Sequence, residues 1–130
     1  MNAAYVDSSC LVAIAMGEAE AGSVKRALLR CDRLFSSNLL EAELRAALAR
    51  EEVVVSPDPL LARISWVLPD RPLTREFTEV LDAGYARGAD LFHLATALLL
   101  DPSRRITFIT LDGRQHEIAR SLGFSVISRR

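Results

Sequence analysis

Two acidic residues follow segments that the sequence predicts as buried strands. Asp7 comes directly after Ala3–Val6, and Asp112 comes just after Ile106–Thr110. Short apolar segments with β-branched or aromatic side chains favour strands. Open α/β sheets bind their ligands beyond the carboxyl ends of the strands, so we expect both carboxylates to lie where chemistry takes place.

A third acid, Glu43, is expected on the apolar side of a helix. The pattern predicts a helix over Asn38–Glu51, in which each residue turns about 100° from the last. Measured from Leu39, Glu43 falls at about 40° and Ala47 at about 80°. Glu41 falls at about 200° and points to water. Because a carboxylate on an apolar face is costly unless something compensates it, Glu43 is expected to have a function.

Asp90 is the fourth acid, and it opens the predicted helix Asp90–Leu100. That helix is apolar almost all round, which is typical of a buried helix, so its first turn should lie close to the core. The acids also have structural interpretations as helix caps or ion-pair partners. These are N-caps at Asp7 and Asp90, capping boxes at Asp112 with Gln115 and at Asn38 with Glu41, and an ion pair of Glu43 with Arg50.

Converging carboxylates in a chain of net charge −1 require a cation. All-oxygen ligands favour Mg²⁺ or Mn²⁺, as one or two ions, over softer metals. Neither Cys-x-x-Cys nor His-Glu-x-x-His occurs in the sequence, so no zinc site is predicted. The two cysteines, Cys10 and Cys31, lie in apolar segments and are predicted to be buried free thiols.

The elements that must position the acids alternate along the chain. Its 130 residues suit one compact domain over 1–130. Alternating strands and helices predict an α/β fold with a parallel sheet covered on both faces. Val53–Val55 fits either a strand or the end of a helix. The predicted strands are Ala3–Val6, Arg33–Ser36, Ile64–Leu68, Ile106–Thr110 and Phe124–Ile127, and the predicted helices are Ser9–Gly17, Glu18–Arg30, Asn38–Glu51, Thr74–Arg87, Asp90–Leu100 and Gly113–Leu122.

Composition limits the partners and the location. The net charge of −1 excludes a globally basic surface for nucleic acid. Every cation except Lys25 is an arginine, which suits phosphate binding but also follows from genomic base composition. The start of the chain lacks a basic signal segment, and the longest apolar stretch, Leu94–Leu100, is too short to span a bilayer. We therefore expect a cytoplasmic protein without a membrane segment.

Four segments, in order along nearly the whole chain, resemble PIN-domain nucleases and in particular the VapC-like toxins of type II toxin–antitoxin systems. Each segment carries one of the acids. The segments are Tyr5-Val6-Asp7-Ser8-Ser9-Cys10-Leu11-Val12, Ser36-Ser37-Asn38-Leu39-Leu40-Glu41-Ala42-Glu43-Leu44, Gly88-Ala89-Asp90-Leu91-Phe92-His93-Leu94-Ala95-Thr96-Ala97, and Phe108-Ile109-Thr110-Leu111-Asp112-Gly113-Arg114-Gln115 with Leu122-Gly123-Phe124.

The resemblance implies a three-layer α/β/α fold whose parallel sheet has strand order 3-2-1-4-5. In that order the strands before Asp7 and Asp112 are neighbours. It also implies a Mg²⁺- or Mn²⁺-dependent endoribonuclease whose products carry 5′-phosphate and 3′-hydroxyl ends. The implied partners are an RNA substrate, a cognate antitoxin protein and a second copy of the chain in a homodimer. The implied catalytic and metal-binding residues are Asp7, Glu43, Asp90 and Asp112.

Three neighbours are predicted to support the acids. Ser8 and Thr110 are placed to hydrogen-bond the carboxylates. Arg114 follows Asp112 closely and is a candidate for contact with substrate phosphate. His93 is interpreted as a hydrogen-bonded core histidine and not as a base.

Two other functions fit part of the pattern. A receiver-like signalling domain also binds Mg²⁺ with acids at strand ends. The sequence has no adjacent acid pair near the first strand, however, and Lys25 is its only lysine. A PIN-like protein-interaction domain without catalysis would keep the fold, but it would have no need of all four acids.

Overall fold

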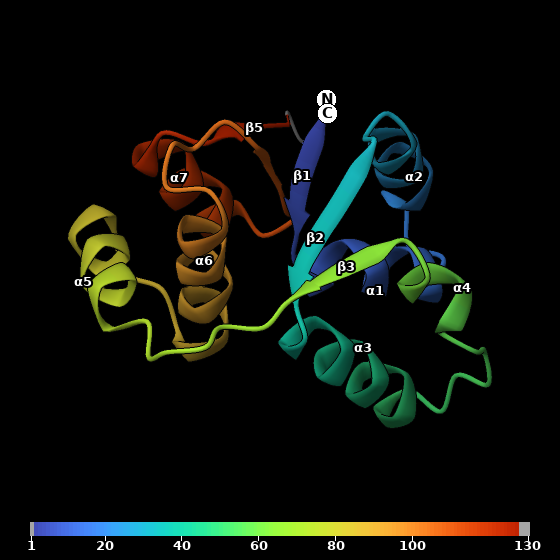
Figure 1. Ribbon diagram of the computed structural model, residues 1–130. Helices are drawn as coiled ribbons and strands as arrows, with labels where there is room; N and C mark the ends of the chain where they lie inside the picture. Colours follow the sequence, from blue (N-terminus) through green and yellow to red (C-terminus); the bar gives the residue numbers. More distant parts are fainter. Residues whose placement is uncertain (1, 128–130) are drawn as a thin grey trace.

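The computed structural model describes residues 2–127, and a parallel sheet of five strands forms its centre (Figure 1). The order β3-β2-β1-β4-β5 confirms the expected 3-2-1-4-5 arrangement. All neighbouring strands are parallel, so their carboxyl ends meet at one edge. The strands are β1 (Ala3–Val6), β2 (Arg33–Ser37), β3 (Ile64–Val67), β4 (Thr107–Ile109) and β5 (Ser125–Val126).

Helices cover both faces of the sheet, which confirms the predicted three-layer α/β/α fold (Figure 1). Helices α1, α2 and α3 pack together on one face, and α5, α6 and α7 pack together on the other. None of the helices in residues 2–127 combines the length and the apolar character needed to cross a bilayer. The helices are α1 (Ser8–Met16), α2 (Ala21–Leu29), α3 (Leu39–Arg50), α4 (Asp58–Leu61), α5 (Thr74–Ala83), α6 (Gly88–Leu100) and α7 (Gly113–Leu122).

The sheet divides the core into two clusters because side chains alternate along each strand. Val6 of β1 joins the cluster beneath α1 and α3. Tyr5 points to the opposite cluster, beneath α6 and α7, where its ring stacks on Phe108 at a centroid distance of 5.3 Å. Burial on both faces is typical of a parallel sheet between two helix layers. Cys10 and Cys31 are buried free thiols, as predicted.

Helix α5 ends at Ala83 and not at the predicted Arg87. Gly84 leaves the helix in an extended conformation and lies so close to α7 that a Cβ atom would approach Ile118 Cγ1 to 2.9 Å. A side chain at this position would therefore have to displace Ile118. The chain between α5 and α6 is irregular instead, and Tyr85 in it is 66% exposed.

Other segments also differ from the prediction. Helix α2 begins at Ala21, three residues after the predicted Glu18. The preceding Gly17 adopts a left-handed conformation, with φ of 66°, and the chain needs the intervening turn to change direction. Val53–Val55 is neither strand nor helix, because Glu52, with φ of 55°, redirects the chain after α3.

Candidate active site

The fold brings the four acids to the carboxyl edge of the sheet. Asp7 directly follows β1, and its backbone N–H donates to the carbonyl of Ile109 in β4 at 3.2 Å. Asp112 follows the end of β4. Glu43 lies in the second turn of α3 on one face of the sheet, and Asp90 lies in the first turn of α6 on the other.

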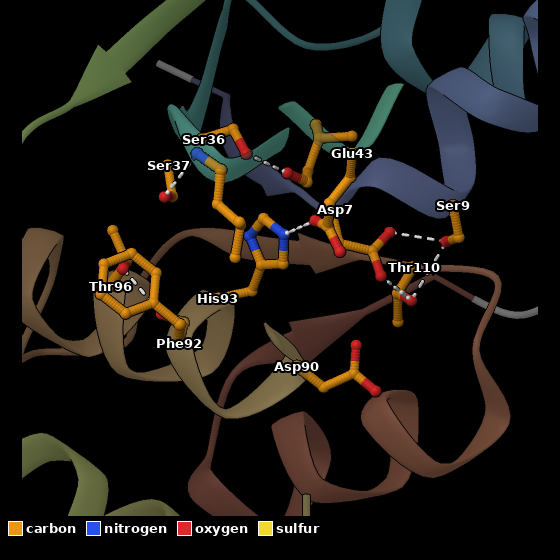
Figure 2. Close-up of polar contacts among 12 residues, drawn as sticks. Asp7, Ser9, Ser36, Ser37, Glu43, Asp90, Phe92, His93, Thr96 and Thr110 are labelled. Carbon is orange, nitrogen blue, oxygen red and sulfur yellow. Dashed lines mark hydrogen bonds and ion pairs between the residues drawn. The ribbon is translucent and has the colours of Figure 1, made fainter. Parts of the chain in front are cut away.

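Two hydroxyl groups hold the buried carboxylate of Asp7 (Figure 2). Ser9 Oγ donates to Asp7 Oδ1, and Thr110 Oγ1 donates to Asp7 Oδ2, both at 2.6 Å. Each hydroxyl oxygen accepts a backbone N–H in turn, from Leu111 at 2.9 Å and from Asp112 at 3.0 Å. Among the described residues, the Asp7 side chain makes no capping bond to α1. Its orientation is therefore fixed, and each oxygen keeps a lone pair for another ligand.

The serine that contacts Asp7 is Ser9 and not the predicted Ser8. Ser8 is the first residue of α1, and its side chain points about 100° away from that of Ser9 around the helix axis. Only Ser9 faces the loop after β4, where it meets Thr110 and Leu111. A hydroxyl two residues after the acid, in the first turn of the following helix, is the sequence signal for this contact.

Burial raises the pKa of Asp7 to about 6, because an ionised carboxylate is poorly stabilised away from water. The hydrogen bonds from Ser9 and Thr110 lower this pKa, and the nearby charge of Asp90 raises it further. At neutral pH the Asp7 carboxylate is therefore ionised, although its hydrogen bonds only partly compensate the cost of burying the charge.

We expect Asp7→Asn to stabilise the metal-free protein at pH 7. The folded-state pKa of about 6 lies above the ordinary value of 3.8, so the wild type loses stability as the pH rises through this interval. The loss is on the order of 2–3 kcal/mol. Asparagine keeps the shape of the side chain and removes the charge. Urea denaturation in the presence of a chelator measures the difference between the two proteins.

The advantage of Asp7→Asn should disappear below about pH 4, where the folded and unfolded wild type both carry the proton. Asp82→Asn on the exposed side of α5 is the control and should change stability little at either pH. An Asp7→Asn protein that is less stable than the wild type at pH 7 without metal would contradict the prediction.

Glu43 lies at the flank of the buried face of α3 and contacts a histidine on α6. Its side chain is 29% exposed, and Oε1 lies 2.7 Å from Nε2 of His93 (Figure 2). The predicted partner Arg50 pairs with Glu51 instead. The buried stripe of α3 consists of Leu40, Leu44 and Leu48.

Exposure does not separate Glu41 from Glu43, so the expectation that only Glu41 points to water is wrong. The side chain of Glu41 is 31% exposed, because Arg45 lies against it and donates at 2.8 Å. Asn38 Nδ2 donates to the Glu41 carboxylate at 3.0 Å and does not form the predicted capping box. The two glutamates differ in their partners: Glu41 has a local arginine, whereas Glu43 reaches across the sheet edge to His93.

Asp90 interacts with the charges of the other acids. Helix α6 begins at Gly88, so Asp90 lies inside the first turn and is not the predicted N-cap. Burial raises the pKa of Asp90, and the charges of Asp112 and Glu43 raise it further. The guanidinium of Arg87 lowers it. The carboxylates are therefore close enough to repel one another.

Asp112 caps α7, because its Oδ1 accepts the backbone N–H of Gln115 at 2.8 Å. The Gln115 side chain does not complete the predicted capping box. Its Nε2 donates to the backbone carbonyl of Asp90 at 3.3 Å, and the residue is 1% exposed. Gln115 thereby joins the first turn of α6 to that of α7 and fixes two of the acid-bearing segments relative to each other.

A cavity of about 370 Å³ opens beside Asp90 and Asp112. Its other lining residues are Tyr85, Arg87 and Arg114. Arg87 and Arg114 are exposed, so positive and negative side chains border the same space.

The chemistry of these side chains fits a hard divalent cation. Within residues 2–127, no three His, Cys, Asp or Glu side chains already form a metal cluster, and the carboxylates would have to close around an ion. The donors are nonetheless all oxygens, as Mg²⁺ and Mn²⁺ prefer. In the described part of the chain, Asp7, Asp90 and Asp112 have no Arg or Lys within ion-pair distance. A cation would relieve the repulsion at Asp90.

Tyr5 and Gln115 also belong to the site, although the sequence analysis did not assign them to it. Tyr5 is 0% exposed, and its hydroxyl lies 2.7 Å from Nδ1 of His93. A phenol within an otherwise apolar strand requires a buried partner for its hydroxyl, which is the sequence signal for this contact. Gln115 offers no comparable signal, because its apparent capping role conceals its contact with α6.

Comparison with known proteins gives a match to one family model, described as the PIN domain, over residues 4–121. The matched region includes all four acids and the residues that hold Asp7. No curated protein matches the chain.

Proposed function

The chain belongs to the PIN-domain family, which has a metal-dependent nuclease fold, and from this membership we propose that it is an endoribonuclease dependent on Mg²⁺ or Mn²⁺. The observation that carries the proposal is the convergence of four carboxylates from separate segments on one edge of the sheet. Structural ion pairs would neutralise such acids locally, yet Asp90 is repelled by two of the others. The proposed metal ligands are Asp7, Glu43, Asp90 and Asp112.

The protein's part in the reaction is to hold these carboxylates and the RNA in place. Asp7 is fixed by two hydroxyls, and Asp90 and Asp112 are fixed by the linked starts of α6 and α7. Glu43 approaches from the opposite helix layer. Mg²⁺ or Mn²⁺, as one or two ions, supplies charge neutralisation at the phosphodiester and activation of the attacking water. No side-chain nucleophile is needed, and the products carry 5′-phosphate and 3′-hydroxyl ends.

The cavity beside Asp90 supports RNA as the substrate. Arg87 and Arg114 line it, and guanidinium groups bind phosphate oxygens in a bidentate manner. The exposed ring of Tyr85 offers a face on which an unpaired base can stack. Single-stranded RNA supplies both groups, with its bases free of pairing.

We propose further that the chain is the VapC-like toxin of a VapBC-type pair and acts as a cytoplasmic homodimer with a cognate antitoxin. The order of the four acid-bearing segments supports this assignment. An antitoxin arginine that entered between the carboxylates would pair with them and inhibit the enzyme, because bidentate arginine–carboxylate pairs are strong. Co-purification with the product of a neighbouring short reading frame, and loss of activity in that complex, would test the pairing.

Cleavage of a labelled single-stranded RNA tests the proposed activity. We expect the purified protein to cleave it in Mg²⁺ or Mn²⁺, to stop when a chelator is added, and to recover when the metal is restored. The products should accept ligation through a 5′-phosphate. Cleavage that persists in the chelator, or products with 2′,3′-cyclic phosphate ends, would contradict the mechanism. A protein that binds RNA or a partner but never cleaves would indicate a silent PIN-like domain.

A further inference from the structure

A buried series of hydrogen bonds leads from the backbone of β2 to Glu43. The N–H of Ser37 donates to the hydroxyl oxygen of Tyr5 at 3.0 Å. That hydroxyl lies 2.7 Å from Nδ1 of His93, and Nε2 of the same ring lies 2.7 Å from Glu43 Oε1 (Figure 2). Tyr5 and His93 are 0% and 1% exposed. The series therefore connects the sheet to the one proposed metal ligand that comes from α3.

The two ends of the series determine where its protons lie. The Ser37 N–H can only donate, and an ionised Glu43 carboxylate can only accept. Nε2 of His93 must therefore carry a hydrogen. In a neutral imidazole, Nδ1 is then an acceptor, which takes the hydroxyl proton of Tyr5. The Tyr5 oxygen remains free to accept from Ser37, so one arrangement satisfies every group in the series.

The ring of His93 is also fixed by packing. It meets the ring of Tyr5 edge-on at a centroid distance of 5.8 Å, and Tyr5 stacks on Phe108 at 5.3 Å. Rotation of the imidazole would break its bonds to Tyr5 and Glu43 together. The Nε2–H group is therefore presented to Glu43 in one direction.

We propose that His93 is a positioning residue that, through its Nε2–H group, holds Glu43 for metal binding. This inference rests on the proposed metal-dependent function. The hydrogen bond from His93 occupies Glu43 Oε1 and restricts the rotamers of a long side chain. Because Nε2 carries a hydrogen and Nδ1 accepts from Tyr5, His93 has no free lone pair with which to act as a general base.

Two amide substitutions separate positioning from packing. The amide nitrogen of glutamine can take the place of Nε2, whereas the shorter asparagine reaches only the place of Nδ1. We expect His93→Asn to weaken Mn²⁺ binding by about 10–100-fold and to lower kcat with little change in KM for RNA. His93→Gln should restore most of the affinity. Both variants lose the imidazole ring, so a purely structural role would make them equally defective.

The tautomer can be observed directly in the metal-free protein. Long-range ¹H–¹⁵N correlation spectra distinguish the protonated from the unprotonated ring nitrogen, and we expect Nε2 of His93 to carry a hydrogen. Tyr5→Phe removes only the hydroxyl group and should weaken Mn²⁺ binding less than His93→Asn. His116→Gln, at the other histidine of the chain, assigns the spectra and should leave Mn²⁺ binding unchanged.

The outcomes separate this inference from the proposed function. If the wild type binds Mn²⁺ and cleaves RNA, but His93→Asn and His93→Gln behave alike, the positioning role is overturned and the nuclease remains. A hydrogen on Nδ1 alone would also overturn it. If the wild type neither binds Mn²⁺ nor cleaves RNA, the proposed function itself fails.

Discussion

Glu43→Gln is expected to reduce the rate of RNA cleavage by about 10²–10³-fold while the protein stays folded. The substitution preserves the length and shape of the side chain and removes one of the charges that balance a divalent cation. Because the cation stabilises charge that develops in the transition state, the loss should appear in kcat. Initial rates on a fluorogenic single-stranded RNA at saturating Mg²⁺ measure the effect, and circular dichroism verifies the fold.

Glu41→Gln is the matched control for this prediction. Glu41 lies on the same helix and is 31% exposed, compared with 29% for Glu43, but it pairs with Arg45 and not with His93. We expect it to retain essentially the wild-type rate. Equal activities of the two variants would show that the charge of Glu43 has no part in catalysis.

Leu44→Ala is expected to lower the free energy of unfolding by about 2–5 kcal/mol. Leu44 is 0% exposed and lies at the centre of the stripe that packs α3 onto the sheet, next to Glu43. Its truncation removes buried apolar surface and leaves a cavity that the neighbouring side chains fill only partly. Since domains are typically stable by about 5–15 kcal/mol, much of the total would be lost. Chemical denaturation followed by circular dichroism provides the measurement.

Leu81→Ala provides the comparison, because Leu81 on α5 is 46% exposed. Its truncation should change the stability by less than about 1 kcal/mol. A Leu44→Ala protein no less stable than Leu81→Ala would show that the buried stripe does not anchor α3 to the sheet. Contacts other than this stripe would then hold Glu43 in position.

The placement of Asp7 and Asp112 was predictable because both depend on local pattern. Each follows a strand directly or closely, and parallel strands end at a common edge. That β1 and β4 are neighbours was not available from periodicity, and it came from the resemblance to PIN-domain nucleases. Membership of that family also decides against the receiver-like alternative.

Glu43 shows where the sequence argument was incomplete. The helical periodicity singled out this residue, but the stripe that is buried runs along Leu40, Leu44 and Leu48, and Glu43 lies at its flank. Exposure therefore does not distinguish it from Glu41. The distinguishing contact is with His93, 50 residues further along the chain. Such a contact depends on how two helices pack across the sheet edge, which no local pattern specifies.

The predicted end of α5 was wrong for a related reason. Its periodicity continues towards Arg87, but the helix ends at Ala83, where Gly84 adopts an extended conformation close to Ile118 on α7. The irregular segment that results carries Tyr85 and Arg87 to the cavity beside Asp90. The extended conformation of Gly84, which no helical pattern predicts, thus sets both the helix boundary and the start of a segment that lines the proposed substrate site.

Calorimetric titration of Mn²⁺ into the metal-free protein tests the central claim most directly. We predict that the wild type binds one or two ions saturably. In Asp90→Asn we predict an affinity at least about tenfold weaker, because this variant lacks the negative charge that the charges of Asp112 and Glu43 repel in the metal-free protein. Absence of Mn²⁺ binding to the wild type, or equal affinity in Asp90→Asn, would contradict the account.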